Sequence, residues 1–324
     1  MKSLSLASLL LLATTLAVQA QPSQVLKPST ATKTKDDAAA TRMGEYKGVK
    51  HAIGVVDINS DEGFRFEENA KQNMRAMLES ALFATNRFVI VERSNLEAVV
   101  MEQDLQKSNR AAKSKDVAQT GKLRSARYIA ACTVTEASSQ KSGDKGGLRI
   151  KEFKIGGSAT KSALVLVVKL VDTTTGEVVA SERIRGEAGS NSLNLGYAKG
   201  SWGADVASFA KTPMGQAAQD CINRAVTFIS KQMEQFPTEG VVVSATEQNL
   251  IISLGENYGI RSGQLFIVRR NGELLTDPDT GEILGESEGE VIGTLEVTST
   301  REKLSYCKLV DGDLPDRGDV VVVK

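Results

Sequence analysis

The residues that could bind a metal ion or act as nucleophiles are few and far apart in this sequence. His51 is the only histidine, and the three cysteines are Cys132, Cys221 and Cys307. Zinc sites draw Cys and His ligands from closely spaced pairs, and this spacing offers none. An odd number of cysteines leaves at least one thiol outside any disulfide within the chain. All three lie in apolar stretches, so we expect small buried side chains.

An acidic stretch near the C-terminus has part of the spacing of a calcium-binding loop. Asp277–Glu288, DPDTGEILGESE, places carboxylates at the first, third and twelfth positions of that pattern. Its glycine stands at the fifth position instead of the sixth, and strand-like segments flank it. We therefore predict a hairpin turn, with a calcium site as the alternative. No paired-carboxylate, nucleophile–base or phosphate-loop signature occurs, so we predict neither enzymatic activity nor a cofactor.

The composition is that of an ordinary soluble protein. The 324 residues are 41% hydrophobic and 25% charged, and 40 basic residues balance 40 acidic ones. This length is typical of one or two domains. No basic face dominates, so nucleic acid is not an expected partner.

The N-terminal residues predict export from the cytoplasm. Met1–Ala20 has a positive Lys2, an apolar run at Leu9–Ala17 and small residues before Gln21, as a Sec-type signal peptide does. The apolar run is too short to span a membrane. No cysteine stands at the cleavage site, so a lipoprotein is not expected. The following segment, Gln21–Glu45, lacks periodic apolar spacing and predicts a flexible leader.

The segment Arg87–Gln103, RFVIVERSNLEAVVMEQ, predicts a strand followed directly by a helix. Phe88–Val91 is a short apolar run rich in β-branched residues, which is typical of a buried strand. Ser94 and Glu97 have capping-box spacing, in which each side chain accepts the backbone N–H of the other residue. Apolar residues at helical spacing then give the helix one apolar face. They are Leu96, Val99 and Val100.

Strands alternate with helices through the first two thirds of the chain, which indicates an α/β layer. One strand of this layer, Leu164–Val171, is apolar on both faces. Such a strand is central in a sheet covered on both sides, or it passes into another apolar medium. The expected elements are strand His51–Ile58, helix Glu67–Thr85, strand Ala126–Thr135, hairpin Ser162–Ile184 and a helix from Thr212 to Pro237.

The last part of the chain has a different pattern. From Gly240 onward, short strand-like runs are separated by Gly, Asn and Asp turns. This spacing predicts a small all-β barrel whose boundary with the α/β layer lies near Thr238.

Two irregular insertions interrupt the α/β layer, at Ala137–Lys161 and Gly186–Lys211. In the second, apolar residues alternate with small or polar ones around a turn, and aromatic residues lie near the ends. The pattern is typical of a transmembrane β-hairpin, and a Gly-rich soluble loop explains it equally well. The residues that would face lipid are Leu193, Leu195, Tyr197, Trp202, Ala204 and Val206, with a weaker set of Leu148, Ile150, Phe153 and Ile155 in the first insertion.

Three stretches resemble the CsgG family, which comprises the curli secretion channel and its relatives. They are FVIVERSNLEAVVMEQ, ARYIAACTVTEA and LVVKLVDTTTGEVVAS, and the helix around QDCINRAVTFI also fits. The resemblance implies a periplasmic α/β domain that forms a ring, with each subunit lending two β-hairpins to a shared outer-membrane barrel. The two insertions lie where those hairpins are expected. An isolated hairpin in lipid would leave backbone groups unpaired, so insertion would require ring closure.

The sequence departs from the family pattern in three places. It has no lipid-anchoring cysteine, its loop Asn59–Phe66 is shorter than the family's channel constriction, and Gly240–Lys324 is additional. The additional part resembles the C-terminal barrel of the flagellar assembly protein FlgT, through LGENYGIRSGQLFIVRR. That second resemblance implies a docking module of the cell envelope.

The expected organisation is a signal peptide (1–20), a flexible leader (21–45), a CsgG-like α/β domain with two β-hairpin insertions (46–236) and a small all-β barrel (238–324). The expected function is that of a ring-forming periplasmic protein, in contact with the outer membrane, that exports or assembles surface polymers such as curli-like fibres. Its partners would be further copies of itself, polymer subunits and other envelope assembly proteins. A soluble periplasmic scaffold with the same fold and no pore is the alternative.

Overall fold

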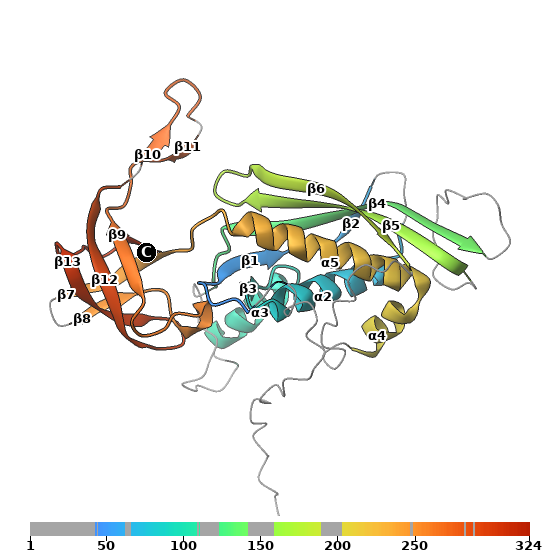
Figure 1. Ribbon diagram of the computed structural model, residues 1–324, viewed down its shortest axis with the longest axis horizontal. Helices are drawn as coiled ribbons and strands as arrows, with labels where there is room; N and C mark the ends of the chain where they lie inside the picture. Colours follow the sequence, from blue (N-terminus) through green and yellow to red (C-terminus); the bar gives the residue numbers. More distant parts are fainter. Residues whose placement is uncertain are drawn as a thin grey trace, which may run out of the picture. The chain divides into compact units, whose positions relative to one another are not determined.

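A computed structural model describes most of the chain after residue 42 (Figure 1). The described residues are 43, 45–61, 66–108, 110, 123–141, 159–188, 203–246, 249–281, 283–287 and 289–324. All of them belong to one compact unit, Lys35–Lys324. The expected signal peptide, most of the expected leader and the tips of both insertions lie outside the described residues.

A mixed sheet forms the first part of the described chain, with strand order β3-β1-β4-β5-β6 and a short β2 beside β4. β1 runs parallel to β3 and β4, whereas β4, β5 and β6 are antiparallel. The sequence prediction of alternating strands and helices is confirmed here. The strands are β1 His51–Val55, β2 Asn59–Ser60, β3 Phe88–Val91, β4 Tyr128–Lys141, β5 Ala159–Asp172 and β6 Val178–Glu187.

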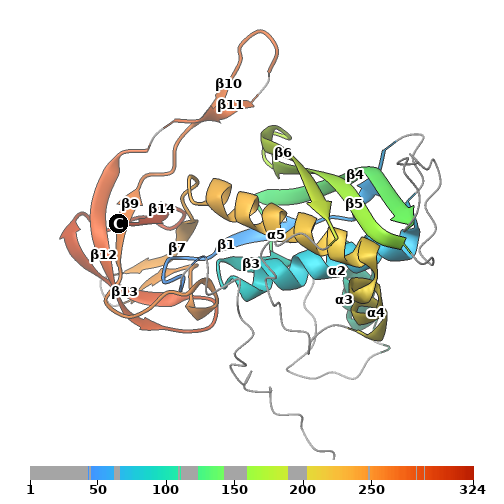
Figure 2. The same cartoon turned by 45° about the vertical axis from the view of Figure 1, so that its right-hand side comes forward.

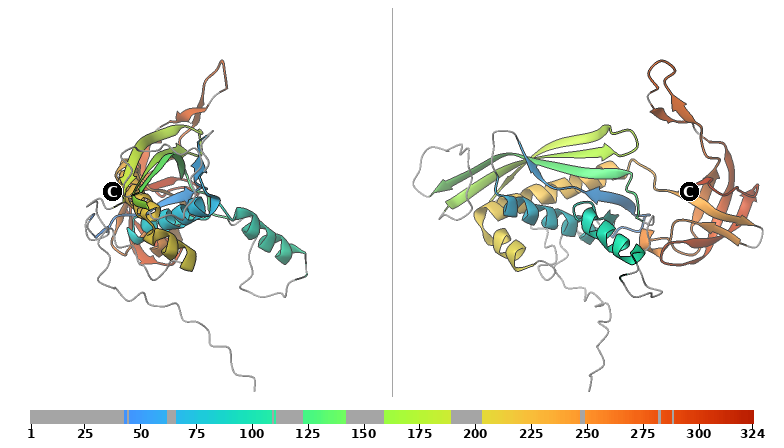
Figure 3. Two further views of the ribbon diagram at one scale, coloured as in Figure 1. Left: turned by 90° about the vertical axis from the view of Figure 1, so that its right-hand side faces the viewer. Right: turned by 180° about the vertical axis from the view of Figure 1, so that it is seen from behind.

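Three helices complete the layer: α2 Glu68–Ala84, α4 Ala204–Lys211 and α5 Pro213–Met233. Figures 1 and 3 show α2 and α5 lying along the same face of the sheet. The predicted start of α5 is confirmed, because the Gly215 N–H donates to Thr212 Oγ1 at 2.9 Å and Pro213 takes the first helical position. Methionine and leucine from α2 meet alanine and isoleucine from α5 in one core, and these side chains have no exposed surface. They include Met74, Met77, Leu78, Ala218, Ile222 and Ile229.

β5 is central in the sheet, as its apolar sequence predicts. Leu164, Leu166, Val168 and Leu170 point to the helix-covered face and are 0% exposed. On the opposite face Lys169 is exposed, and no helix of the described chain covers that face (Figures 1 and 3). The sheet was expected to be covered on both faces. In the described part of the chain, helices cover one face, so for helices this expectation is wrong.

Helix α3, Leu96–Lys107, follows β3 as predicted, but the predicted capping box is absent. The N-cap residue is Asn95, and the Ser94 hydroxyl has no hydrogen-bond partner among the described residues. Instead, Glu92 Oε1 accepts the backbone N–H groups of Ser94 at 2.8 Å and Asn95 at 2.9 Å. A carboxylate one turn earlier satisfies the free N–H groups, so Glu97 is not needed for this role. In Figure 3, left, α3 projects away from α2 and α5, and Val100, Met101 and Leu105 of its apolar face are exposed.

The last part of the described chain is a closed barrel of six strands, in the order β12-β13-β8-β7-β14-β9 (Figure 2). Phe266, Ile252 and Val321 fill its interior and are 0% exposed. The prediction of a small barrel from the Gly-punctuated strand runs is confirmed. Its strands are β7 Glu239–Thr246, β8 Asn249–Ile252, β9 Leu265–Arg269, β12 Val291–Thr300, β13 Ser305–Gly312 and β14 Val320–Val323, with the short helix η1 Glu256–Tyr258 between β8 and β9.

Between β9 and β12 the chain forms a separate two-stranded hairpin of β10, Leu274–Thr276, and β11, Ile283–Glu286. Its turn lies in the stretch that partly matches a calcium-binding loop. Asp277 Oδ1 accepts the N–H groups of Asp279 and Thr280, each at 2.8 Å, and these bonds lower the pKa of Asp277. Gly281 closes the turn with φ of 72° and donates to Asp277 O at 2.8 Å. The predicted hairpin turn is confirmed.

Candidate functional site

The hairpin β4–β5 is the first candidate site, because it is longer than the strands on either side of it. β1 stays paired with β4 only to Ala130, and β2 only to Val134. On the other side, β6 stays paired with β5 to Ala163. β4 and β5 continue together to the pair Lys141 and Ala159. Among the described residues, no strand pairs with the outer edge of β4 beyond Val134. Strand edges of this kind can pair with another strand.

A β-bulge marks the point where this extended part of β4 begins. The register of β4 and β5 shifts between Val134 and Glu136, so Thr135 is the extra residue. A bulge bends the strand and increases its twist, which changes the direction of the residues that follow it. Arg183 on β6 donates to Glu136 on β4 at 2.9 Å, and this ion pair crosses over β5. Bulge and ion pair together fix where the extended end of the hairpin leaves the sheet.

The start of the second insertion is fixed to α5. The Glu187 N–H donates to Asp220 Oδ2 at 3.1 Å, and Arg224 pairs with the same carboxylate at 3.2 Å. Asp220 is buried, so these two contacts compensate its charge. Gly186 lies so close to α5 that a Cβ would meet Ala217 O at 2.3 Å. Glycine is therefore required where β6 ends.

Only two of the six residues predicted to face lipid are described. Ala204 and Val206 lie on helix α4 and not on a strand, so the predicted strand at these positions is wrong. Asp205 in the first turn and Lys211 in the last complement the helix dipole, and Val206 packs against the α/β core. The lipid-facing role itself stays a prediction, because Leu193, Leu195, Tyr197 and Trp202 lie outside the described residues.

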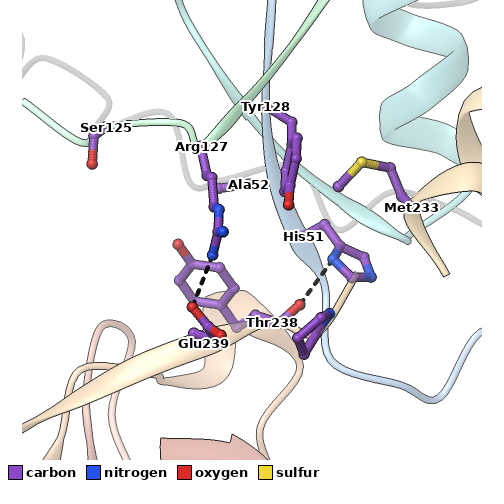
Figure 4. A pocket seen from close by; sticks show the side chains of 10 residues that line it. His51, Ala52, Ser125, Arg127, Tyr128, Met233, Thr238 and Glu239 are labelled. Carbon is purple, nitrogen blue, oxygen red and sulfur yellow. Dashed lines mark hydrogen bonds and ion pairs between the residues drawn. The ribbon is translucent and has the colours of Figure 1, made fainter. Parts of the chain in front are cut away.

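A pocket of about 230 Å³ is a second candidate site, which the sequence analysis did not predict (Figure 4). Its lining residues come from strands and loops that are distant in sequence, so no local motif could indicate it. They are His51, Ala52, Ser125, Arg127, Tyr128, Met233, Pro237, Thr238, Glu239 and Tyr258.

The polar groups of this pocket already bind one another. Thr238 Oγ1 lies 3.0 Å from His51 Nδ1 and 3.4 Å from Lys50 O. Arg127 pairs with Glu239 at 2.9 Å and with Asp172 at 3.3 Å. Burial lowers the pKa of His51, so its ring is neutral at neutral pH. These contacts connect the α/β layer to the first strand of the barrel, which is a structural role.

The metal-ligating and thiol side chains of the described residues form no further chemical site. No group of three His, Cys, Asp or Glu residues in the described part could hold a metal ion. Cys132, Cys221 and Cys307 are free and buried, as predicted, and burial raises the pKa of each thiol to about 12. None of the described helices combines the length and the hydropathy that a membrane-spanning helix needs.

Comparison with protein families gives one match. The family described as curli production assembly/transport component CsgG matches residues 34–249, which is more than half of the chain. The match ends within the barrel, at the start of β8, and leaves the rest of the barrel unassigned. No curated protein sequence matches at a significant level.

Several solved structures are weakly similar. A PelC dodecamer from Paraburkholderia phytofirmans is 15% identical, with 56% of this chain and 86% of that chain covered and a TM-score of 0.29. The lipoprotein GNA1162 from Neisseria meningitidis is 17% identical, with 43% and 82% covered and a TM-score of 0.24. The C-terminal domain of LpoB from Escherichia coli is 12% identical, with 46% and 93% covered and a TM-score of 0.24. At these scores the assignment depends on the family match alone.

Proposed function

This chain belongs to the CsgG family, and from that membership we propose that it forms a ring in the periplasm that helps to export or assemble surface polymers. The family is described as an assembly and transport component, which makes the chain a cell-envelope assembly or secretion protein. Three features of this function are proposals: the ring, the contact with the outer membrane, and curli-like fibres as the cargo.

The observation that carries the ring is that β4 and β5 extend together beyond the strands on either side of them. An edge strand with unpaired N–H and C=O groups pairs readily with a strand of another chain. In a closed ring, each copy would offer this edge to its neighbour, so no edge would remain exposed. The bulge at Thr135 supports this role, since bulges commonly mark the place where a strand leaves its sheet.

The mechanism we propose is passive. A ring of α/β parts supports a shared barrel or collar made from the two insertions, and the C-terminal barrel docks other envelope proteins. In this proposal the residues facing lipid include Leu193, Leu195, Tyr197 and Trp202 of the second insertion. Ring closure would satisfy the backbone groups that a single hairpin leaves unpaired in lipid.

The test is the mass of the full mature chain, extracted in detergent and measured by light scattering and negative-stain imaging. We expect rings of one size. A variant in which residues 138–162 are replaced by Asn-Gly should be monomeric, because it lacks most of the part of β4 and β5 that extends beyond the neighbouring strands. Changing Thr174 and Thr175 to Ala at the opposite end of β5 is the control and should leave the rings intact. A monomeric mature chain would refute the proposal.

The alternative is a soluble periplasmic scaffold or assembly factor of the same fold without a pore. The charge-rich first insertion favours it, because residues 141–154 include Lys145, Arg149, Lys151 and Glu152. Charged side chains on a lipid-facing strand are costly. Membrane fractionation after salt and carbonate washing separates the two: complete release into the soluble fraction supports the scaffold and rules out the pore.

A further inference from the structure

The sheet face opposite the helices is apolar at its centre and basic at its margin. On β5, Val165, Val167 and Val171 point to this face, which is opposite to the fully buried leucines. Across the antiparallel pairing, Val165 lies beside Arg185 and Val167 beside Arg183. Lys169 lies between these valines on the same strand and is exposed. We call this surface, Val165, Val167, Lys169, Val171, Arg183 and Arg185, the basic face.

The charges of the basic face are only partly balanced. Arg183 pairs with Glu136 at 2.9 Å, and Arg185 pairs with Glu187 at 2.9 Å. The Arg183 pair crosses over β5, where Val165 is only 1% exposed. No described ion pair includes Lys169. Lys169 is therefore the cation of this face without an acidic partner among the described residues, and Val167 and Val171 beside it are partly exposed.

The hairpin β10–β11 has the opposite chemistry. The range 271–291, which we call the acidic arm, contains seven acidic residues and no Lys or Arg. Its apolar side chains are uncovered: Leu275 is 48% exposed, Ile283 is 39% exposed and Leu284 is 64% exposed. Among the described side chains of the arm, none forms an ion pair. A two-stranded sheet with uncovered apolar residues is marginally stable alone and gains from a partner surface.

The described residues of the acidic arm also contact one another. At its base the chain segments are so close that a Cβ on Gly272 would meet Ser287 O at 2.0 Å, and one on Gly289 would meet Arg270 O at 1.7 Å. At its tip, Asp277 accepts two backbone N–H groups of its own turn. These contacts hold the base and the turn of the hairpin together without a partner, which would lower the conformational entropy lost on docking.

We propose that the acidic arm of one copy docks on the basic face of a neighbouring copy. Charge decides the partner surface, since contact between two acidic arms would bring like charges together. An arm on one surface and a receiving face on another make a head-to-tail contact, which closes into a ring when the rotation permits. The inference rests on the proposed ring and adds the contact that joins its subunits outside the β4 edge.

The test uses two charge-reversed variants of the full mature chain. The arm variant is Glu273→Lys with Asp279→Lys, and the face variant is Lys169→Glu with Arg185→Glu. In each variant alone, the arm and the face of neighbouring copies carry charges of the same sign. We therefore expect the protein concentration at which half of the chains are assembled to be about tenfold or more above that of the wild type. An equal mixture of the two restores opposite charges at every contact, so its assembly should return to the wild-type concentration.

The matched control reverses two exposed acids elsewhere on the barrel, Glu302→Lys with Asp313→Lys, and should assemble as the wild type does. Circular dichroism checks that every variant is folded. If the wild type is monomeric, the ring itself fails. If the wild type forms rings and both variants assemble equally well, only the docking inference is refuted. If each variant is weakened but the mixture does not recover, the arm docks on its own copy and the inference is likewise wrong.

Discussion

At the scale of single residues, Gly186 shows how a missing side chain sets the distance between a strand and a helix. It lies at the end of β6, where Asp220 on α5 receives the following backbone N–H. Cys221 packs at the same place, with its Sγ 3.4 Å from Leu164 O. The sequence analysis placed Gly186 at the start of an irregular insertion. It could not predict the role of Gly186, because that role depends on Ala217 and Cys221, which lie more than thirty residues later in α5.

Gly186→Ala should destabilise the fold by about 1–3 kcal/mol, because the new Cβ meets backbone atoms that cannot move aside alone. It would lie 2.3 Å from Ala217 O and 2.7 Å from Cys221 N. Urea unfolding followed by circular dichroism measures the change. Gly203→Ala is the control, because no atom lies within 4 Å of its Cβ position. Equal midpoints for both variants would contradict this account of Gly186.

His51 should make the stability of the protein depend on pH near neutrality. Burial lowers the folded-state pKa of His51 below its ordinary value of 6.5. Above that pH the ring is neutral in both states and has no effect. As the pH falls below 6.5, the unfolded chain binds a proton that the folded state resists, so the free energy of unfolding decreases until the folded pKa is passed.

The variant His51→Asn removes this term, and its stability should fall less than that of the wild type between pH 7 and pH values below 6.5. Unfolding midpoints at several pH values measure the difference. Parallel curves for the two proteins would show that His51 has the same pKa in both states.

At the scale of elements, the start of α3 separates what local sequence could predict from what it could not. The strand β3 and the following helix were predicted because their apolar spacing is local. The cap was assigned to Ser94 and Glu97, but Glu92 takes that role. The rule for a capping box considers only the residues from the cap onward, so it misses a carboxylate that reaches forward from the end of a strand.

Glu92→Ala should therefore weaken the first turn of α3 by about 1 kcal/mol, the usual cost of losing a cap. Ser94→Ala should have little effect, because its hydroxyl makes no hydrogen bond among the described residues. Amide hydrogen exchange at the start of α3 reports this turn directly.

Backbone N–H bonds lower the pKa of Glu92, so the stabilisation is present at neutral pH and is lost as the pH falls through the folded pKa. A larger loss of protection for Ser94→Ala than for Glu92→Ala would instead support the predicted capping box.

At the scale of the whole molecule, periodic apolar patterns were sufficient to predict the α/β layer and the barrel. They were not sufficient at Ala204 and Val206, where alternation over a few residues fits a strand and a helix equally. The residues that meet in the pocket, such as His51, Arg127 and Tyr258, are brought together only by the fold. The basic face and the acidic arm likewise depend on strand register, which the sequence did not determine.

The segment before β1 gives a last test, because it joins the core of the barrel. Val49 is 7% exposed and packs in the same cluster as Phe266 and Val268, and the Lys50 N–H donates to Tyr258 O at 2.8 Å. The boundary predicted near Thr238 would leave Val49 outside the barrel. Val49→Ala should destabilise the barrel by about 2 kcal/mol, since it removes two buried methyl groups and leaves a small cavity.

Hydrogen exchange measured by mass spectrometry can localise this loss. Protection should decrease in the barrel strands β7, β8, β9, β12, β13 and β14 and should be retained in β1 and β4 to β6. Val241→Ala, at a position that is 43% exposed on the outside of β7, is the matched control and should change little. Equal loss in both parts would mean that sheet and barrel unfold as one cooperative unit. No loss in the barrel would mean that residues 239–324 form a core without the preceding segment.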